Sequence, residues 1–276
     1  MRSYPEVFQN YFTSVYKERW PKLLSALEGA EVQTPRVNTF EKNIPAFVEG
    51  IEIPRGEGGL LGYYIMDPAS IEAANTLDVQ SDDFVLDMCA APGGKTLILA
   101  EALGKSGKLV ANEISESRRE RLKKVIQQYI PREVRDHVFV TGKDAGKFAL
   151  THKNYFDKIL VDAPCSGERH LLENAKELAG WTESRSKKLA QRQYALLTAA
   201  LLSAKKSGRI VYSTCTISPI ENDQVIEELL RRKAGTFEVV KPSIMPMGAE
   251  STKYGIQFLP DQCGFGPIYY CILKRK

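Results

Sequence analysis

The pattern of apolar and polar residues predicts a helical segment at the start of the chain. Apolar side chains recur at helical spacing over residues 4–28. Pro21 is expected to divide this segment into two helices, because proline disrupts a helix interior, and Gly29 is expected to end it. Two short extended segments, 34–39 and 51–54, follow.

A glycine-rich loop then predicts a boundary. Residues 55–59 (RGEGG) are typical of a flexible connection. We therefore expect a small N-terminal region over residues 1–60 and a larger domain over residues 61–276. The larger domain opens with a predicted helix that begins at Pro68, because Asp67 is suited to cap it and proline is favoured at the first helical position.

Strand and helix patterns alternate through the larger domain. Apolar runs predict seven strands, at 84–87, 108–113, 138–140, 156–162, 209–215, 237–240 and 268–273. Helical patterns intervene at 97–100, 115–129, 184–206 and 219–232. This alternation predicts a three-layer α/β fold with a mostly parallel seven-stranded sheet, in which the last two strands form a hairpin at one edge.

Composition narrows the class of protein. The 276 residues carry a formal net charge of +4, which is compatible with nucleic-acid binding without requiring it. Five cysteines without Cys-x-x-Cys spacing, and three separated histidines, predict neither a zinc site nor a disulfide framework. The first residues contain no apolar signal stretch, and no apolar run could span a membrane, so we expect a cytoplasmic protein with no membrane partner.

The junction between the strand at 84–87 and the following helix predicts a ligand site. A strand, a glycine turn and a helix N-terminus in this order hold nucleotide-like ligands in doubly wound sheets. A Walker motif would need glycine at Cys89, and a dinucleotide fingerprint does not match the glycine turn. S-adenosylmethionine remains, because Glu113 can accept hydrogen bonds from its ribose and Asp144 can hold its adenine. Four successive strands end near an acid: Asp87, Glu113, Asp144 and Asp162.

Two cysteines are candidates for the chemistry. Cys165 and Cys215 each follow an apolar run, so both are expected at the carboxyl edge of the sheet, near the glycine turn. A thiolate is a strong nucleophile when a nearby cation lowers its pKa, and Lys95 is the candidate cation. Carbon 5 of a pyrimidine accepts a methyl group only after a thiolate adds to carbon 6 and an acid stabilises the adduct. Asp162 and the cysteines supply groups of this kind.

Three motifs carry a family resemblance: DMCAAPGGKT (87–96), DAPCSG (162–167) and YSTCT (212–216). In this order they resemble the Sun-domain (Nop/Sun-type) RNA cytosine-5 methyltransferases, and the segments 36–39 and 66–70 also fit that family. The residues after Cys165 and the segment 265–271 resemble the short mitochondrial-type members and their bacterial relatives. The resemblance implies a Rossmann-like S-adenosylmethionine-dependent methyltransferase fold.

The resemblance also implies residue roles. Cys215 would be the nucleophile and Cys165 would assist breakdown of the covalent adduct, while Asp162 would contact the cytosine edge beside Lys95. Glu113 stands where the family often has aspartate and keeps its charge. The implied S-adenosylmethionine-binding residues are Cys89, Ala90, Ala91, Pro92, Gly93, Gly94, Lys95, Glu113, Arg118, Asp144 and Asp162.

The implied substrate is RNA, with ribosomal RNA ahead of transfer RNA. No further RNA-binding domain is expected. RNA would then be bound by the N-terminal region, by the basic helices around 118–124 and 185–192, or by a partner protein. We expect the protein itself to be a monomer. Trp181 is one candidate for stacking on the base, although a core position is commoner.

Other functions stay open at this point. An RNA-binding ribosome-assembly factor would keep the fold with a vestigial methyltransferase role. DNA cytosine enzymes carry the nucleophile in the Pro-Cys segment, and adenine enzymes expect a Pro-Pro-aromatic segment that Ala163-Pro164-Cys165 does not provide.

Overall fold

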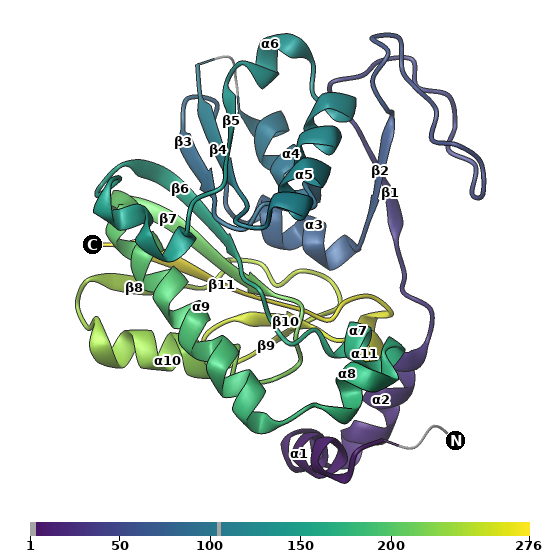
Figure 1. The fold of residues 1–276 in the computed structure, drawn as a ribbon, viewed down its shortest axis with the longest axis vertical. Coiled ribbons are helices and arrows are strands. Elements are labelled where there is room, and N and C mark those ends of the chain that lie inside the picture. The colour runs from purple at the N-terminus through teal and green to yellow at the C-terminus, as the bar shows by residue number, and fades with distance from the viewer. Residues whose placement is uncertain (1–3, 104–105) are drawn as a thin grey trace.

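The N-terminal helices lie at the lower end of the molecule in Figure 1. The computed structural model describes residues 4–103 and 106–276, so residues 1–3 of the expected N-terminal region lie outside the described part. The segment contains helix α1 (Glu6–Tyr16), a 3-10 turn (Lys17–Arg19) and helix α2 (Trp20–Glu28). The predicted division is confirmed, with Pro21 in the first turn of α2, where its missing N–H costs no hydrogen bond.

A two-stranded antiparallel sheet follows the helices. Strand β1 (Thr34–Val37) pairs with β2 (Tyr63–Met66), and this pairing crosses the expected division at residue 60. The segment 51–54, which is expected to be extended, belongs to no strand of the described residues. That segment lies in an irregular loop, where proline at position 54 removes a backbone donor. The division into two regions stays a prediction.

A nine-stranded sheet forms the centre of the molecule, with β5-β4-β3-β6-β7 parallel at its core. The parallel strands are β3 (Phe84–Asp87), β4 (Lys108–Asn112), β5 (Val138–Thr141), β6 (Phe156–Asp162) and β7 (Ala204–Thr214). The α/β class and the mostly parallel order are confirmed.

The antiparallel edge differs from the prediction. Strand β11 (Ile268–Arg275) pairs with β7 on one side and with both β8 (Phe237–Val240) and β10 (Ile256–Phe258) on the other. Strand β9 (Ala249–Ser251) pairs with β10. The sheet thus has nine strands within residues 4–103 and 106–276 instead of the expected seven, because β9 and β10 are too short to show a strand pattern. The expected antiparallel pairing of β8 with β11 is confirmed, but the two strands are not a simple hairpin, because β9 and β10 come between them in the sequence.

Helices cover both faces of the sheet (Figure 1). One face carries α3 (Pro68–Asn75), α4 (Gly94–Ala102) and α5 (Glu116–Tyr129), and the other carries the 3-10 helix η2 (Ala145–Leu150), α9 (Glu183–Ser203) and α10 (Asp223–Arg232). Asp67 caps α3 as predicted, accepting from the backbone of Ala69 and Ser70. Short helices complete the fold: α6 (Arg132–Arg135), α7 (Glu168–Glu173), α8 (Ala175–Ala179) and α11 (Pro260–Cys263).

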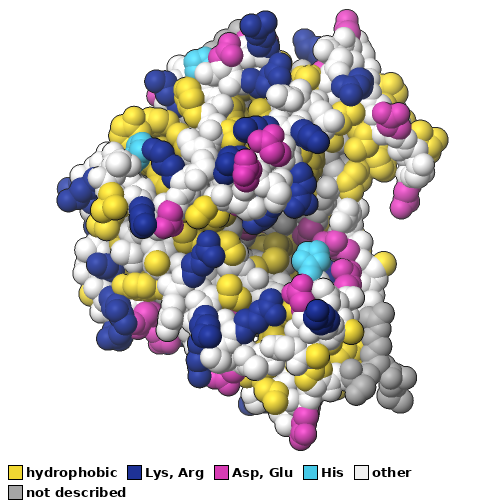
Figure 2. Space-filling view, viewed as in Figure 1, with side chains coloured by type: hydrophobic (Ala, Val, Ile, Leu, Met, Phe, Trp, Pro, Cys, Tyr) yellow, Lys and Arg dark blue, Asp and Glu magenta, His cyan; other side chains and the backbone are white. Residues whose placement is uncertain are grey.

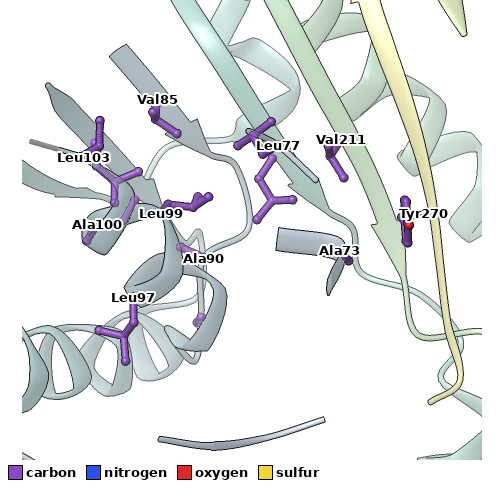
Figure 3. Close-up of a cluster of buried hydrophobic side chains, with 14 of the residues drawn as sticks. Ala73, Leu77, Val85, Ala90, Leu97, Leu99, Ala100, Leu103, Val211 and Tyr270 are labelled. Carbon is purple, nitrogen blue, oxygen red and sulfur yellow. The ribbon is translucent and has the colours of Figure 1, made fainter. Parts of the chain in front are cut away.

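Alternation along the strands divides the core into two layers. In β3, Val85 faces the α3–α4–α5 layer and Leu86 faces the α9–α10 layer. In β7, Val211 and Tyr212 divide in the same way, because successive side chains of a strand point to opposite faces. Figure 3 shows the first layer, where Leu97 and Leu99 come from α4, Leu77 from the turn after α3, and Val85 and Val211 from the sheet.

A third apolar cluster attaches α1 and α2 to α7, α8 and the segment after β7. Phe8 and Phe12 of α1 pack on Trp181, whose ring lies 5.3 Å from that of Phe8. Trp181 is only 2% exposed, so it belongs to the core and cannot stack on a base. The N-terminal helices therefore share a core with α7 and α8.

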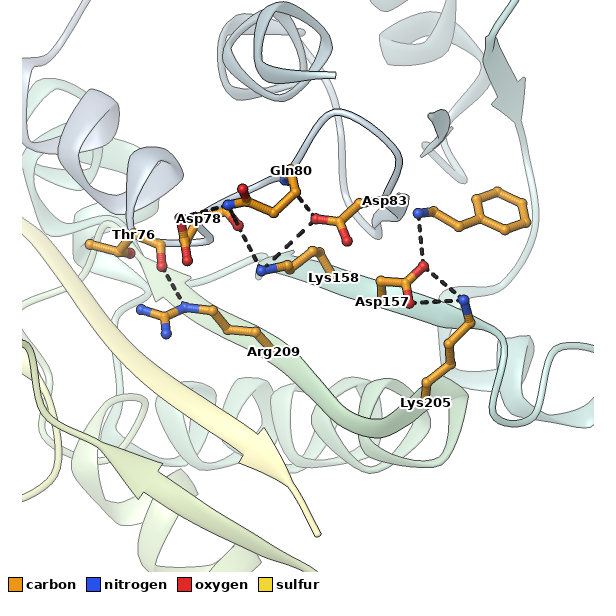
Figure 4. A network of polar contacts seen from close by, with 9 residues as sticks. Thr76, Asp78, Gln80, Asp83, Asp157, Lys158, Lys205 and Arg209 are labelled. Atoms are coloured by element: carbon orange, nitrogen blue, oxygen red, sulfur yellow. Dashed lines mark hydrogen bonds and ion pairs between the residues drawn. The ribbon is translucent and has the colours of Figure 1, made fainter. Parts of the chain in front are cut away.

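Polar contacts link the strands at the edge opposite the glycine turn (Figure 4). Lys158 of β6 donates to the Asp78 carbonyl at 2.6 Å, and Arg209 of β7 donates to the Thr76 carbonyl at 2.8 Å. Lys205 bonds both carboxylate oxygens of Asp157 at 2.8 Å. These contacts fix the start of β6 against the connection after α3.

None of the helices in the described residues is long and apolar enough to cross a membrane. Across 4–103 and 106–276, no cluster of three His, Cys, Asp or Glu side chains is arranged to hold a metal ion.

Candidate active site

A groove of about 600 Å³ lies at the carboxyl ends of the parallel strands. Its walls come from the glycine turn after β3, from the ends of β6 and β7, and from the loop before β11. The sequence-predicted residues that line it are Cys89, Ala91, Pro92, Lys95, Arg118, Asp162, Cys165 and Cys215. The fold thus brings both candidate cysteines and the candidate cation into one space.

The two cysteine sulfurs are in contact. Cys165 follows β6 and Cys215 follows β7, and their Sγ atoms are 3.2 Å apart because these strands are parallel neighbours. The backbone N–H of Cys215 also donates to the sulfur of Cys165, at 3.2 Å. The hydrogen bond with Cys215, followed by burial, raises the pKa of the Cys165 thiol. Cys165 therefore keeps its proton, which suits a proton donor better than a nucleophile.

Lys95 and Asp162 form an ion pair beside the sulfurs. Lys95 lies in the first turn of α4, and its Nζ is 2.9 Å from Asp162 Oδ2 and 3.4 Å from Ser70 Oγ. Burial lowers the pKa of Lys95, but the charges of Asp162 and Cys215 outweigh it, so the net shift is upward. Lys95 stays protonated and faces the groove rather than solvent, with its side chain 13% exposed.

The two glycines of the turn allow close packing of neighbouring elements. Gly93 has φ +124°, and a Cβ there would lie 2.9 Å from Val125 Cγ1 of α5. A Cβ at Gly94 would lie 2.7 Å from the Tyr64 ring of β2. Both glycines are therefore required by packing within the protein, in addition to any approach of a ligand. Gly94 and Ala90 line a smaller cavity of about 170 Å³ next to the groove.

A second cavity, of about 240 Å³, shares Cys89, Arg118 and Pro164 with the groove. Glu113 lies in it and is 3% exposed, and its Oε1 accepts from the Ser115 N–H at 2.8 Å. Its Oε2 accepts no hydrogen bond from the described residues and lies 3.3 Å from Arg118 Nη1. Arg118 also donates to the Ala91 carbonyl at 2.8 Å, so it joins Glu113 to the glycine turn.

The other two acids differ in their surroundings. Asp144 is exposed, lines the second cavity and caps η2 through the Gly146 N–H at 3.1 Å. Asp87 is buried and accepts from Thr96 Oγ1 at 2.7 Å. Burial raises the pKa of Asp87 to about 7. Asp87 therefore holds the start of α4 and does not line the groove.

Sequence reasoning missed a buried polar set behind the cysteines. Glu168 and Glu221 are both fully buried, and Gln193 of α9 donates to Glu221 Oε2 and to the Pro164 carbonyl, each at 2.9 Å. Burial, followed by the charge of Glu221, raises the pKa of Glu168. The sequence contains a hint of this set, because Ser166 and Thr216 directly follow the two cysteines. Glu168 comes three residues after Cys165, and Glu221 comes six residues after Cys215.

Arg192 was expected only as part of a basic helix face. It lies instead in the second cavity, together with Glu113 and Asp144. Two basic residues of the same face form ion pairs, because Arg185 lies 3.4 Å from Glu177 and Lys187 lies 2.6 Å from Glu183.

Comparison with known proteins places this chain in a family. A sequence model described as 16S rRNA methyltransferase RsmB/F matches residues 74–274. The chain is 36% identical over 238 residues to the 5-cytosine rRNA methyltransferase NSUN4 of Mus musculus, covering 80% of this chain and 62% of that protein. It is 38% identical over 180 residues to the mitochondrial tRNA (cytosine(34)-C(5))-methyltransferase of Danio rerio, covering 64% and 48%.

The chain thus spans less than two thirds of the length of these relatives. A crystal structure of a methyltransferase homologue from Pyrococcus horikoshii matches with a TM-score of 0.79 and 23% identity, covering 99% of this chain and 96% of that one. This likeness shows that the two proteins share a fold.

Proposed function

Since the chain belongs to the RsmB/F methyltransferase family, we propose that it methylates carbon 5 of a cytosine in RNA, with ribosomal RNA as the first candidate. The observation that carries this proposal is the pair of sulfurs 3.2 Å apart beside the Lys95–Asp162 ion pair. A cytosine ring is a poor nucleophile at carbon 5, and a thiolate and an acidic group placed together overcome this.

The residues divide the chemistry as follows. The Cys215 thiolate forms a bond to carbon 6, and Asp162 with Lys95 stabilises the charge that develops on the ring. Once carbon 5 carries the methyl group, its proton must leave before the carbon–sulfur bond to Cys215 can break. Water in the groove takes that proton, the electron pair of the carbon–hydrogen bond restores the ring double bond, and the carbon–sulfur electron pair returns to Cys215. The Cys165 thiol, whose sulfur is 3.2 Å from that of Cys215, stabilises the departing thiolate by donating a hydrogen bond.

S-adenosylmethionine supplies the methyl group when it is bound. The second cavity suits its adenosine part, because Glu113 Oε2 is buried without a hydrogen-bond donor and can accept from ribose hydroxyls. Asp144 lines the same cavity, and Ala145 and Leu196 supply apolar walls for a base. Cys89, Ala91 and Pro92 connect this cavity to the cysteines along the groove.

RNA is the substrate class that suits the groove. Lys95 and Arg118 line it, and Lys and Arg side chains lie above and below the hollow in Figure 2. Cations placed beside an open groove attract a phosphate backbone in a salt-dependent manner. Transfer RNA is the alternative substrate, because one relative acts on it. Bisulfite sequencing of rRNA and tRNA from cells with and without the gene distinguishes the two.

Activity of cysteine variants tests the proposal. Cys215→Ala should abolish methyl transfer to RNA, and Cys165→Ala should accumulate a covalent protein–RNA band on a denaturing gel. Cys263→Ala is the matched control, because Cys263 bonds the Leu259 and Phe265 carbonyls away from the groove. Full turnover by Cys215→Ala would overturn the proposed mechanism.

A further inference from the structure

The two loops that carry the cysteines are joined by buried carboxylates, each of which accepts a hydrogen bond from the backbone of the other loop. Glu168, on the Cys165 side, accepts from the Ile217 N–H at 2.9 Å. Glu221, on the Cys215 side, accepts from the Ser166 N–H at 3.0 Å. Each loop therefore supplies a carboxylate to the backbone of the other, and the two contacts lie immediately behind the sulfurs.

Two hydroxyl groups complete this arrangement. Ser166 and Thr216 directly follow the cysteines, and their hydroxyl oxygens are 2.9 Å apart. The Ser166 hydroxyl also donates to Glu168 Oε1, and Thr216 Oγ1 accepts from the Ser218 N–H at 2.9 Å. Gln193 connects the set to α9, because it bonds Glu221 and the Pro164 carbonyl. Buried polar networks with several satisfied bonds hold their members in one geometry.

Burial makes this set unusual for a purely structural contact. Glu168, Glu221, Gln193 and Thr216 are each fully buried. Carboxylates in such a position cost free energy unless they are well bonded, and an apolar pair would often be as stable. A role in fixing geometry therefore accounts for them better than a role in stability.

We propose that Glu168 and Glu221 are positioning residues that hold the Cys165 and Cys215 sulfurs in contact during the reaction. This inference rests on the proposed function. Resolution of the covalent adduct requires both sulfurs near one ring, so loosening either loop should slow breakdown of the adduct more than its formation. Displacement of a reacting group by about 1 Å can cost about 100-fold in rate.

Substitutions of Glu168 provide the test. Glu168→Met keeps the volume and removes both acceptors, whereas Glu168→Gln keeps an acceptor for Ile217 and can donate to the Ser166 hydroxyl. Glu173→Met on the same helix is the control, because Glu173 is 71% exposed. With a small-subunit rRNA transcript and S-adenosylmethionine, Glu168→Met should turn over at least about tenfold more slowly and accumulate the covalent adduct. Glu168→Gln should retain most activity.

A second measurement needs no RNA. Diamide takes one hydrogen from each of two neighbouring thiols and leaves a disulfide, which a mass loss on the intact protein and peptide mapping detect. We expect Cys165 and Cys215 to pair at least about tenfold more slowly in Glu168→Met than in the unsubstituted protein. If Glu168→Met does not fold, Ser166→Ala removes the bridging hydroxyl and should slow the pairing in the same direction.

The results separate this inference from the proposed function. Slower disulfide formation in the variants supports the positioning role even if no RNA is methylated by the unsubstituted protein. A folded Glu168→Met or Ser166→Ala variant that forms the disulfide at the unsubstituted rate would overturn it. So would loss of all activity in Glu168→Met without any adduct, because a general structural defect lowers adduct formation as well.

Discussion

Replacement of Gly93 by alanine tests the packing account of the glycine turn. Gly93 has φ +124°, a conformation that residues with a Cβ rarely adopt. The added Cβ would lie 2.9 Å from Val125 Cγ1 and 3.2 Å from Val125 Cβ. The turn must therefore move away from α5, which also moves Ala91 and its contact with Arg118.

Backbone strain and overpacking together determine how much folding stability Gly93→Ala loses. Holding a non-glycine residue in a sparsely populated backbone region costs about 1–3 kcal/mol. Overpacking a buried contact costs a further ~1–3 kcal/mol. A domain of this size loses roughly 2–4 °C of melting temperature per kcal/mol, so Gly93→Ala should melt at least about 4 °C lower. The affinity for S-adenosylmethionine should fall with it.

A double-mutant cycle isolates the steric term. Thermal unfolding of Gly93→Ala, Val125→Ala and the double variant should reveal a coupling of about 1 kcal/mol or more, because Val125→Ala removes the nearest clashing atom. Gly59→Ala measures backbone strain alone, since Gly59 has φ +84° with no atom near its Cβ position. If Gly93→Ala costs the same with and without Val125, the contact with α5 does not explain the glycine.

Three further predictions concern charged groups. Asp87 has a folded-state pKa of about 7 against 3.8 as its ordinary value, so the folding stability it contributes should fall as the pH rises from about 4 to about 7. Asp87→Asn should remove that decline in urea unfolding. Lys95→Met leaves Asp162 without its cation and should lower kcat at least about 100-fold, with a smaller change in KM for RNA. Arg118→Met should raise KM for S-adenosylmethionine about tenfold, since it releases Glu113 and is itself partly exposed.

Exposed residues of α5 provide controls for these variants. Lys124→Met and Arg121→Met remove a positive charge at exposed positions and should leave kcat and KM for S-adenosylmethionine near their unsubstituted values. An unchanged kcat in Lys95→Met would exclude the ion pair from catalysis. A pH profile of stability that is identical for Asp87→Asn and the unsubstituted protein would show that Asp87 titrates normally.

The sequence pattern was sufficient to predict those parts of the fold and the site that depend on a single strand. The apolar runs that became β3, β6 and β7 are buried on both faces, so each is a continuous hydrophobic segment whose end can be read directly. Because those ends meet at one edge, Cys165 and Cys215 could be placed together without a structure. The same reasoning placed Lys95 near them.

Features that depend on pairs of distant segments could not be read from the sequence. Strands β9 and β10 have three residues each, and they form only because β10 pairs with the edge of β11 and β9 pairs with β10. Asp87 stands at the end of its strand, as Asp162 does. Thr96 packs over Asp87, however, so Asp87 is buried and holds the start of α4 instead of lining the groove. The exchange between Glu168 and Glu221 depends on the register of two loops, which no local pattern encodes.

Mapping of the covalent adduct tests the central claim most directly. The Cys165→Ala variant is incubated with substrate RNA and S-adenosylmethionine, the complex is digested with nuclease and protease, and the modified peptide is identified by mass spectrometry. The account predicts a methylated cytidine attached to the sulfur of Cys215. Attachment to any other cysteine, or methylated RNA without an adduct on Cys215, would contradict it.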